Sequence, residues 1–189
     1  NDNGVLTQYN PTAITTYGDT NSPGSEQYTN AIDNNVYTKF LNFHETGAGF
    51  VVTFSNATVI DKLTFTTAND DYGRDPTTVS IYGSNHSTSS GFSLIENNVS
   101  LNRVTNRYSA YNSGSGDTFT NSTPYEHYRV VVTAVHDAAA ANSFQFSEVD
   151  FYDTGATGTG TDADVTIDGG TTALVLAAST IDGDLTVRS

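Results

Sequence analysis

The chain contains a polar run directly before an aromatic, apolar run, "NAIDNNVYTKFLNF" at residues 30–43. Asp33 offers a carboxylate, Thr38 offers a hydroxyl and a carbonyl, and Asn30 and Asn35 can offer backbone carbonyls. These are hard oxygen donors, and a calcium ion in a protein takes about six to eight of them. We therefore interpret the stretch as a calcium-binding loop that leads into a core strand.

A calcium site of this kind needs a further carboxylate, and Glu148 is the candidate. It lies in "FQFSEVDFYD" (144–153), where the apolar alternation shifts by one residue, as it does at a β-bulge. A buried glutamate costs free energy unless it is paired or bound to a metal. The alternative is that Asp33 only caps a turn and that Glu148 faces solvent.

Much of the remaining sequence has the period of a β-strand. Leu63 and Phe65, for example, alternate with threonines, as expected for a half-buried strand. Helical periodicity is weak and predicts only a turn or two at 26–33 and one at 136–143. We expect strands at 47–54, 59–68, 77–85, 92–101, 128–135 and 144–153. Six or more strands with turns between them predict an all-β, antiparallel sandwich.

Composition excludes several function classes. The 189 residues include 21 Asp and Glu against seven Lys and Arg, which gives a formal net charge of −14. Binding to nucleic acid or to an anionic membrane surface needs clustered basic residues, so neither is expected. Cys is absent, which excludes disulfides and thiolate ligands, and no apolar run approaches the roughly 20 residues of a membrane helix.

The two ends of the chain carry further signals. The sequence begins "NDNGVL" without a methionine, as after removal of a signal peptide, so we expect a secreted, extracellular protein. Residues 1–153 form the predicted sandwich, and the Gly/Thr-rich residues 154–164 read as a linker. In residues 165–189, "TIDGG" recurs as "TIDGD" after 14 residues, which predicts a short repeat of β-strands.

The quoted stretch resembles the discoidin, or coagulation factor 5/8 type C, domains, a group that includes the family 32 carbohydrate-binding modules. "VIDKLTFTTANDDYGRDPTTVSIYGSN" (59–85), "YEHYRVVVTAV" (125–135) and "NSFQFSEVDFY" (142–152) follow it in the order of that family, and the resemblance spans roughly residues 10–153. It implies a galactose-binding-domain-like jelly-roll β-sandwich. The family's structural calcium site maps onto Asn30, Asp33, Asn35, Thr38, the Ser147 carbonyl and Glu148.

Two positions depart from the family pattern. Phe40 stands where a tryptophan is usual, which reduces core area. Asp33–Asn34 stands where Asp-Gly is usual, but Asn tolerates a positive φ nearly as Gly does, so the turn is expected to survive. Neither departure removes a calcium oxygen.

Sugar binding in this family uses loops at one end of the sandwich, and those loops vary. An aromatic ring face with fixed polar neighbours suits a sugar ring. The loop 68–76 offers such a set, the loop 42–49 adds a histidine and a glutamate, and the loop 136–143 adds His136 beside an asparagine. The candidate ligand-binding residues are His44, Asp70, Asp71, Tyr72, Arg74 and Asn142.

Each candidate also has a plain structural interpretation. Arg74 and Asp75 before Pro76 can form a turn with an internal ion pair, and the two histidines can be ordinary surface residues. Catalysis is not expected. The chain has no nucleophile elbow, zincin motif or P-loop, and the adjacent Asp70 and Asp71 diverge on an extended segment.

Two functions follow. One is a secreted, calcium-stabilised, non-catalytic module that binds an extracellular glycan, as in adhesion. The other is a structural subunit of a filament, sheath or surface layer, assembled from copies of the chain through residues 165–189. Recognition of lipid or protein, as in animal discoidin domains, is less favoured because the loops are acidic.

Overall fold

The structure is a computed structural model that describes residues 6–18, 20–111, 117–155, 166–168 and 186–188. It divides into two units, residues 1–155 and 156–189. Within the described part of the first unit the helices are short 3-10 turns, η1 (Tyr28–Ile32) and η2 (Tyr72–Arg74). No helix among the described residues has the length and apolarity to cross a membrane. The all-β expectation is confirmed.

The larger sheet has five antiparallel strands in the order β2-β4-β8-β6-β7. Its strands are β2 (Ala13–Tyr17), β4 (Gly49–Thr58), β6 (Pro76–Ser84), β7 (Ser93–Ser100) and β8 (Tyr125–Val135). Alternation decides which side chains enter the core. Along β8, Tyr128 and Val130 are buried in the core cluster, and Arg129 between them faces outward.

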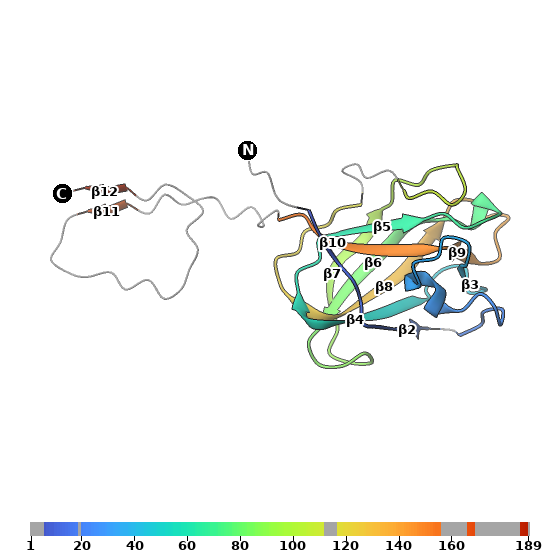
Figure 1. The fold of residues 1–189 in the computed structure, drawn as a ribbon, viewed down its shortest axis with the longest axis horizontal. Helices are drawn as coiled ribbons and strands as arrows, with labels where there is room; N and C mark the ends of the chain where they lie inside the picture. Colours follow the sequence, from blue (N-terminus) through green and yellow to red (C-terminus); the bar gives the residue numbers. More distant parts are fainter. Residues whose placement is uncertain (1–5, 19, 112–116, 156–165, 169–185, 189) are drawn as a thin grey trace. The chain divides into compact units, whose positions relative to one another are not determined.

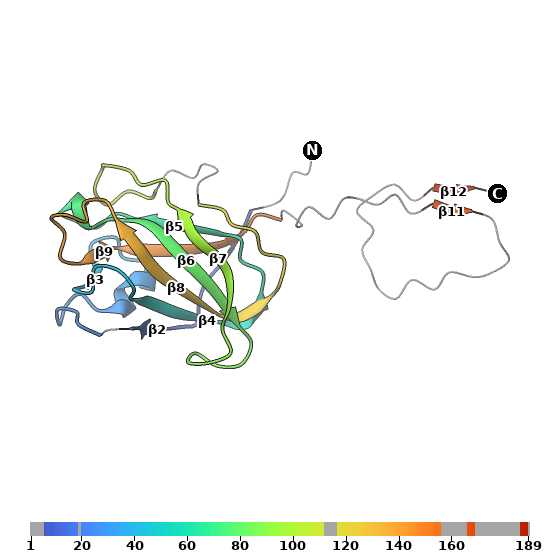
Figure 2. The ribbon, with the colours of Figure 1, turned by 180° about the vertical axis from the view of Figure 1, so that it is seen from behind.

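The opposing layer is smaller. A three-stranded antiparallel sheet has the order β1-β10-β5, with β1 (Thr7–Tyr9), β5 (Lys62–Thr66) and β10 (Glu148–Asp153), and a separate pair joins β3 (Phe40–Asn42) to β9 (Phe144–Phe146). Figure 1 shows β10 in front of the large sheet, and Figure 2 shows β7, β6 and β8 nearest the viewer from behind. The two layers form the expected antiparallel sandwich.

Aromatic rings fill the space between the layers. Phe40 is completely buried and meets Phe144 and Phe146 edge-on, with ring centres 5.3 and 5.7 Å apart. Phe65 meets Phe146 edge-on at 4.8 Å. Such edge-to-face pairs are favourable beyond the area they bury. A phenylalanine at position 40 is therefore compatible with a closed core.

The register step expected at Ser147–Glu148 is a change of partner strand. Phe144–Phe146 pairs with β3, and from Glu148 onward the chain pairs with β5, starting opposite Thr66. Ser147 stands between the two strands and donates its backbone N–H to Thr66 O at 2.8 Å. The prediction of a simple bulge in one continuous strand was therefore wrong. The change of partner turns Glu148 toward residues 33–35.

Most predicted strands are confirmed, with ends that differ by a few residues. The strand expected at the end of the 30–43 stretch is β3, which has three residues, whereas the sequence missed β1, also three residues long, and β2. Strands this short show too few alternations for periodicity to be detected. They are fixed by their partners, because β1 adds to β10, β2 to β4 and β3 to β9.

In the second unit the structure describes two short strands. β11 (Thr166–Asp168) pairs with β12 (Thr186–Arg188) in parallel, with Thr166 opposite Thr186. The first "TID" of the repeat is thus a strand, but its partner lies 20 residues further on, not 14. The second copy, 180–184, and the expected linker beyond Gly155 lie outside the described residues.

Candidate functional site

The polar loop forms a tight turn around the Asp33 carboxylate. Asp33 Oδ1 accepts a hydrogen bond from Asn35 N at 2.9 Å, and Oδ2 accepts one from Thr38 Oγ1 at 2.8 Å. Asn34 has φ 59°, so the positive φ expected for this asparagine is confirmed. Asp33 does cap a turn, as the alternative interpretation proposed.

Glu148 does not face solvent. Its residue is 8% exposed, and its Oε1 accepts a hydrogen bond from Asn35 N at 2.7 Å. The same N–H therefore points at two carboxylates, those of Asp33 and Glu148. The interpretation that left Glu148 on the surface was wrong, because the change of partner strand at Ser147 turns its side chain toward the loop.

Two carboxylates at one place repel each other. Burial, together with the neighbouring Asp33 carboxylate, raises the pKa of Glu148 to about 7. Within the described part of the chain, no three His, Cys, Asp or Glu side chains gather as a metal site. A cation here would consequently be held by two carboxylates and by neutral oxygens, a set that suits calcium better than zinc.

The neutral oxygens of the loop lie beside these carboxylates. Thr38 Oγ1 is 2.8 Å from both Asp33 Oδ2 and Asn35 O, so three oxygens of different residues meet there. Ser147 uses its N–H and hydroxyl on the carbonyls of Thr66 and Thr67, which leaves its own carbonyl as its remaining oxygen. The residues present thus fit a calcium ion.

Asn30 has a different part in this arrangement. Its side-chain Nδ2 donates to Ser25 O at 2.9 Å and to Lys39 O at 2.8 Å. These bonds tie the start of the loop to its end. The side-chain nitrogen of Asn30 thus has a structural role, and the family resemblance implies its backbone carbonyl as the metal ligand.

Three loops leave the sandwich at one end. Pro76 at the start of β6 pairs with Val135 at the end of β8, and Ser100 at the end of β7 pairs with Thr78. The segments 67–75, 101–111 and 136–143 therefore project from the same end of the large sheet. The loop 43–48 and the loop 136–143 likewise leave the same end of the β3–β9 pair, because Asn42 pairs with Phe144.

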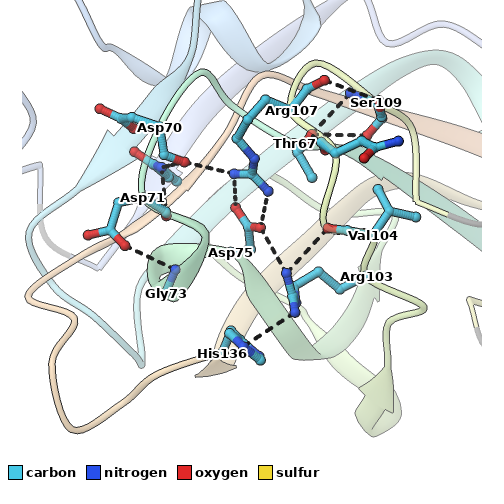
Figure 3. Close-up of polar contacts among 12 residues, drawn as sticks. Thr67, Asp70, Asp71, Gly73, Asp75, Arg103, Val104, Arg107, Ser109 and His136 are labelled. Carbon is cyan, nitrogen blue, oxygen red and sulfur yellow. Dashed lines mark hydrogen bonds and ion pairs between the residues drawn. The ribbon is translucent and has the colours of Figure 1, made fainter.

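A buried ion-pair cluster joins these loops. Asp75 is completely buried, and Arg107 donates to both of its carboxylate oxygens, with the bond from Nη1 at 2.9 Å. Arg103 Nη1 lies 3.5 Å from the same carboxylate. Figure 3 shows both arginines converging on Asp75. The Asp75 carboxylate raises the pKa of Arg107, so this guanidinium stays charged.

The cluster corrects the sequence interpretation of this turn. We expected Arg74 to pair with Asp75. Instead Arg74 Nε lies 3.1 Å from Asp71 Oδ2, although its N–H is not aligned for a hydrogen bond. Asp71 Oδ1 accepts from Gly73 N at 3.0 Å and caps η2. The partners of Asp75 come from a segment more than 25 residues away, so no local pattern signals them.

The candidate aromatic platform is exposed. Tyr72 is 59% exposed, its ring centre lies 5.5 Å from that of His136, and the Arg103 guanidinium carbon lies 5.9 Å from it. Arg103 Nη2 is also 3.3 Å from His136 Nε2. Tyr72, Arg74 and Asp71 thus share one surface with His136, and Arg103 supports the ring.

The remaining predicted ligand residues have separate surroundings. Asp70 Oδ1 is 3.0 Å from Lys39 Nζ, which also donates to Gln145 Oε1 at 3.0 Å, so this carboxylate helps to anchor the end of the polar loop that contains Asp33. His44 and Asn142 are placed in the two loops at the end of the β3–β9 pair. Sequence reasoning missed an exposed pair, Tyr37 and Tyr108, whose ring centres are 5.2 Å apart.

The chain was compared with known proteins at three levels. No model of a known protein family matches it, and no curated protein is similar to it in sequence. Solved structures do match. A family 32 module of Clostridium perfringens NanJ, in complex with galactose, has a TM-score of 0.56 at 14% identity over 79% of this chain and 100% of its own. The fold is that of the family 32 carbohydrate-binding modules.

Two further structures agree with this family 32 fold. A two-module fragment of Clostridium perfringens ZmpB gives a TM-score of 0.57 at 18% identity, over 78% of this chain and 40% of the fragment. The module of AlyQ in complex with 4,5-unsaturated mannuronic acid gives 0.51 at 16% identity, over 77% of this chain and 97% of that module. The discoidin-like fold expected from the sequence is confirmed.

Proposed function

We propose that the chain is a secreted, non-catalytic carbohydrate-binding module whose sugar site lies at the end formed by the loops 67–75, 101–111 and 136–143. The observation that supports it is the exposed ring of Tyr72, backed by Arg103 and beside His136. An aromatic face takes the apolar side of a pyranose, and polar groups with fixed positions take its hydroxyls. The acidic surface suits an extracellular protein that adheres to a glycan.

The neighbours with this fold support a sugar ligand. The NanJ module was solved with galactose, two ZmpB modules with GalNAc, and the AlyQ module with 4,5-unsaturated mannuronic acid. These ligands differ in charge and in ring substituents. We therefore propose a glycan as the class of ligand for this chain and leave its identity to experiment.

A glycan array, probed in calcium-containing buffer, tests the sugar site. Binding to one group of glycans that is lost in Tyr72→Ala and kept in Tyr72→Phe supports the proposal. Failure to bind any galactose-, glucose-, amino-sugar- or uronic-acid-containing glycan would overturn it. A matched control is Tyr37→Ala, which removes another exposed tyrosine ring from a different loop.

We further propose that calcium stabilises this module through Asp33, Asn35, Thr38 and Glu148, with the carbonyls of Asn30 and Ser147. The support is the pair of carboxylates that share one backbone N–H, together with the neighbouring hydroxyl and carbonyl oxygens. When bound, the ion supplies positive charge that holds the loop to β10. It takes no part in any bond-making step.

A second candidate function is assembly of copies through residues 165–189. The observation that favours it is the parallel, in-register pairing of β11 with β12. Successive repeats stack through parallel pairing of this kind, and within the described residues this pair of strands offers both of its edges to further strands. Size-exclusion chromatography of the full chain and of a chain ending at residue 155 tests it. Monomers of both at every concentration would contradict assembly.

A further inference from the structure

The outward face of the large sheet holds an arginine between three aromatic rings. The guanidinium carbon of Arg129 lies 4.5 Å from the ring centre of Tyr17, 4.3 Å from that of Tyr82 and 4.4 Å from that of Phe92. Arg129 is in β8, the central strand, and Figure 2 views this sheet from the side opposite β10. The cluster lies on the face of the sheet and does not include the loop-end residues.

Register explains why these side chains meet. Arg129 pairs with Tyr82 across to β6 and with Val51 across to β4, and Tyr82 pairs with Leu94 in β7. Paired residues point to the same side of a sheet, so they form one row. Tyr17 pairs with Gly49, which has no side chain to separate the tyrosine ring from β8. A methyl group at Gly49 would overlap the Val130 carbonyl, so this gap is fixed by close approach of the backbones.

Arg129 differs from the other arginines of the sandwich. Arg74 pairs with Asp71, and Arg103 and Arg107 pair with Asp75. Over the described residues, the side chain of Arg129 makes no ion pair and no hydrogen bond, and its buried Nε has no acceptor. Contacts with ring faces hold a guanidinium in place but accept none of its five N–H donors. The charge of Arg129 and the N–H groups of its two terminal nitrogens therefore remain available to a ligand.

The surroundings select the chemistry of that ligand. A guanidinium fork binds a carboxylate through two parallel hydrogen bonds. Around it stand half-buried aromatic rings, the 55% exposed Leu94 and the hydroxyl-bearing Thr15 and Tyr82. Apolar faces beside hydroxyls match a sugar ring that carries a carboxylate. The protein has a net charge of −14, so most of its surface repels an anion. An anionic group therefore gains the most favourable electrostatic energy beside a cation, such as Arg129, that has no counter-charge.

A peptide fits this face less well. Peptides that bind sheets usually add to an edge strand, where free backbone N–H and C=O groups pair with them. β8 is flanked by β4 and β6 on its two sides, so its backbone groups are used within the sheet. Only side chains are offered to a ligand here, and they are rings, hydroxyls, the aliphatic Leu94 and the guanidinium of Arg129.

We propose that the outer face of the five-stranded sheet is a second sugar-binding site, which takes a uronic-acid residue with its carboxylate on Arg129 and its ring against Tyr82, Phe92 and Leu94. This site is separate from the loop end and does not depend on the function proposed for it. The module then has two separate sugar-binding surfaces.

Isothermal titration with trigalacturonate and trimannuronate tests the site. Short oligomers are chosen because a long polyanion is repelled by the acidic protein. The matched ligand control is each trisaccharide with its carboxyl groups reduced to alcohols. We expect at least one trisaccharide to bind. Its reduced form should bind at least about tenfold more weakly, and Arg129→Gln should weaken binding of the unreduced trisaccharide by a similar factor. Arg129→Lys is expected to fall between, because it keeps the charge but loses the fork.

Two control variants distinguish this face from the loop end. Arg74→Gln removes the same charge at the loop end and should leave trisaccharide affinity within about twofold. Leu94→Glu places a carboxylate at an exposed position of this face, where it should repel the carboxylate of the sugar and abolish binding. This variant tests the site even where Arg129→Gln fails to fold. Each titration is run with and without calcium.

Three results would overturn the proposal. The first is that neither trisaccharide binds the unmodified chain. The second is that folded Arg129→Gln and Leu94→Glu bind as well as the unmodified chain, or that Arg74→Gln alone loses binding. The third is that binding appears only with added calcium. A calcium ion that bridges the sugar carboxylate to carboxylates of the protein would then account for binding in place of Arg129.

Discussion

At the scale of single residues, Glu148 is the side chain whose state depends most on its surroundings. It is buried beside Asp33, and both carboxylates accept from the same N–H. Without a cation, one of the two must be protonated or the pair must repel. The residue thus couples the fold to calcium and to pH, and each coupling gives a measurable expectation.

Calcium is expected to raise the melting temperature of the chain. An ion that binds only the folded state adds RT ln(1 + [Ca]/Kd), roughly 2.7 kcal/mol at a hundredfold excess over Kd. Asp33→Ala and Glu148→Gln should remove most of that gain, measured by calorimetry with calcium and with EDTA. Asp153→Asn, an exchange of a partly exposed carboxylate away from the loop, is the control. Equal melting temperatures in calcium and in EDTA would rule out the site.

The stability of the metal-free chain is expected to fall as pH rises from about 4.5 to 7. The folded pKa of Glu148 is about 7 and its ordinary value is 4.5, so in this range the folded state binds more protons than the unfolded state. The free energy contributed by the protonated carboxyl is fully present below pH 4.5, amounts to roughly 3 kcal/mol and is lost by pH 7. Urea unfolding along this range measures it.

The variant Glu148→Gln provides the internal comparison for this pH series. It cannot titrate, so its stability should change less across the same range. Saturating calcium should also flatten the profile of the unmodified chain, because the ion favours the ionised carboxylate. If Glu148→Gln follows the same curve as the unmodified chain, another group is responsible.

Tyr72→Ala is expected to weaken glycan binding about tenfold while leaving the fold intact. The ring is 59% exposed, so its loss should change the free energy of unfolding by less than about 1 kcal/mol. Tyr72→Phe keeps the ring face and should bind as the unmodified chain does. Unaltered affinity of Tyr72→Ala for its best glycan would move the sugar site to another loop.

At the scale of elements, one buried carboxylate holds two loops together. Asp75 sits before β6, and its partners Arg103 and Arg107 lie in the segment after β7. Arg107 also donates to Asp70 O at 2.8 Å, which brings the loop of Tyr72 into the same cluster. The loop end is therefore a connected surface, and its shape depends on Asp75, a residue that is completely buried.

Asp75→Asn is expected to lower the free energy of unfolding by about 2 kcal/mol or more, because it leaves two arginines without their counter-charge. The loss should stay below that of a fully buried pair, since Arg107 is partly exposed. Urea unfolding measures it. Asp71→Asn keeps the acceptor for Gly73 N and breaks only an exposed ion pair, so it should cost less than about 1 kcal/mol. Equal losses in the two variants would contradict this account.

At the scale of the whole molecule, the chain joins a closed sandwich to a unit whose strands pair in parallel. The sandwich has its own aromatic core, so residues 1–155 are expected to fold without the rest. The second unit includes Leu174, Val175 and Leu176, which lie outside the described residues. Burying each such side chain is worth about 1.5–3 kcal/mol. We therefore expect residues 165–189 to be covered, most simply by other copies of the chain.

Limited proteolysis at low and high protein concentration measures this expectation. Cleavage within 165–189 should slow as concentration rises, because association buries the segment. Cleavage within the sandwich serves as the control and should not change with concentration. Rapid cutting of 165–189 at every concentration would end the assembly hypothesis and leave the sugar-binding proposals untouched.

The sequence by itself determined the sandwich and the turn at Asp33. Strand alternation, the aromatic core positions and the tolerance of Asn34 for positive φ are local properties, so they can be detected without knowing what packs against them. The tertiary structure alone decided which distant side chains meet. Glu148 reaches a backbone N–H 113 residues away, and Asp75 finds its arginines across two strands. Arg129 is surrounded by rings from three separate segments, because the register of paired strands is set by the packing of the whole sheet and no short stretch encodes it.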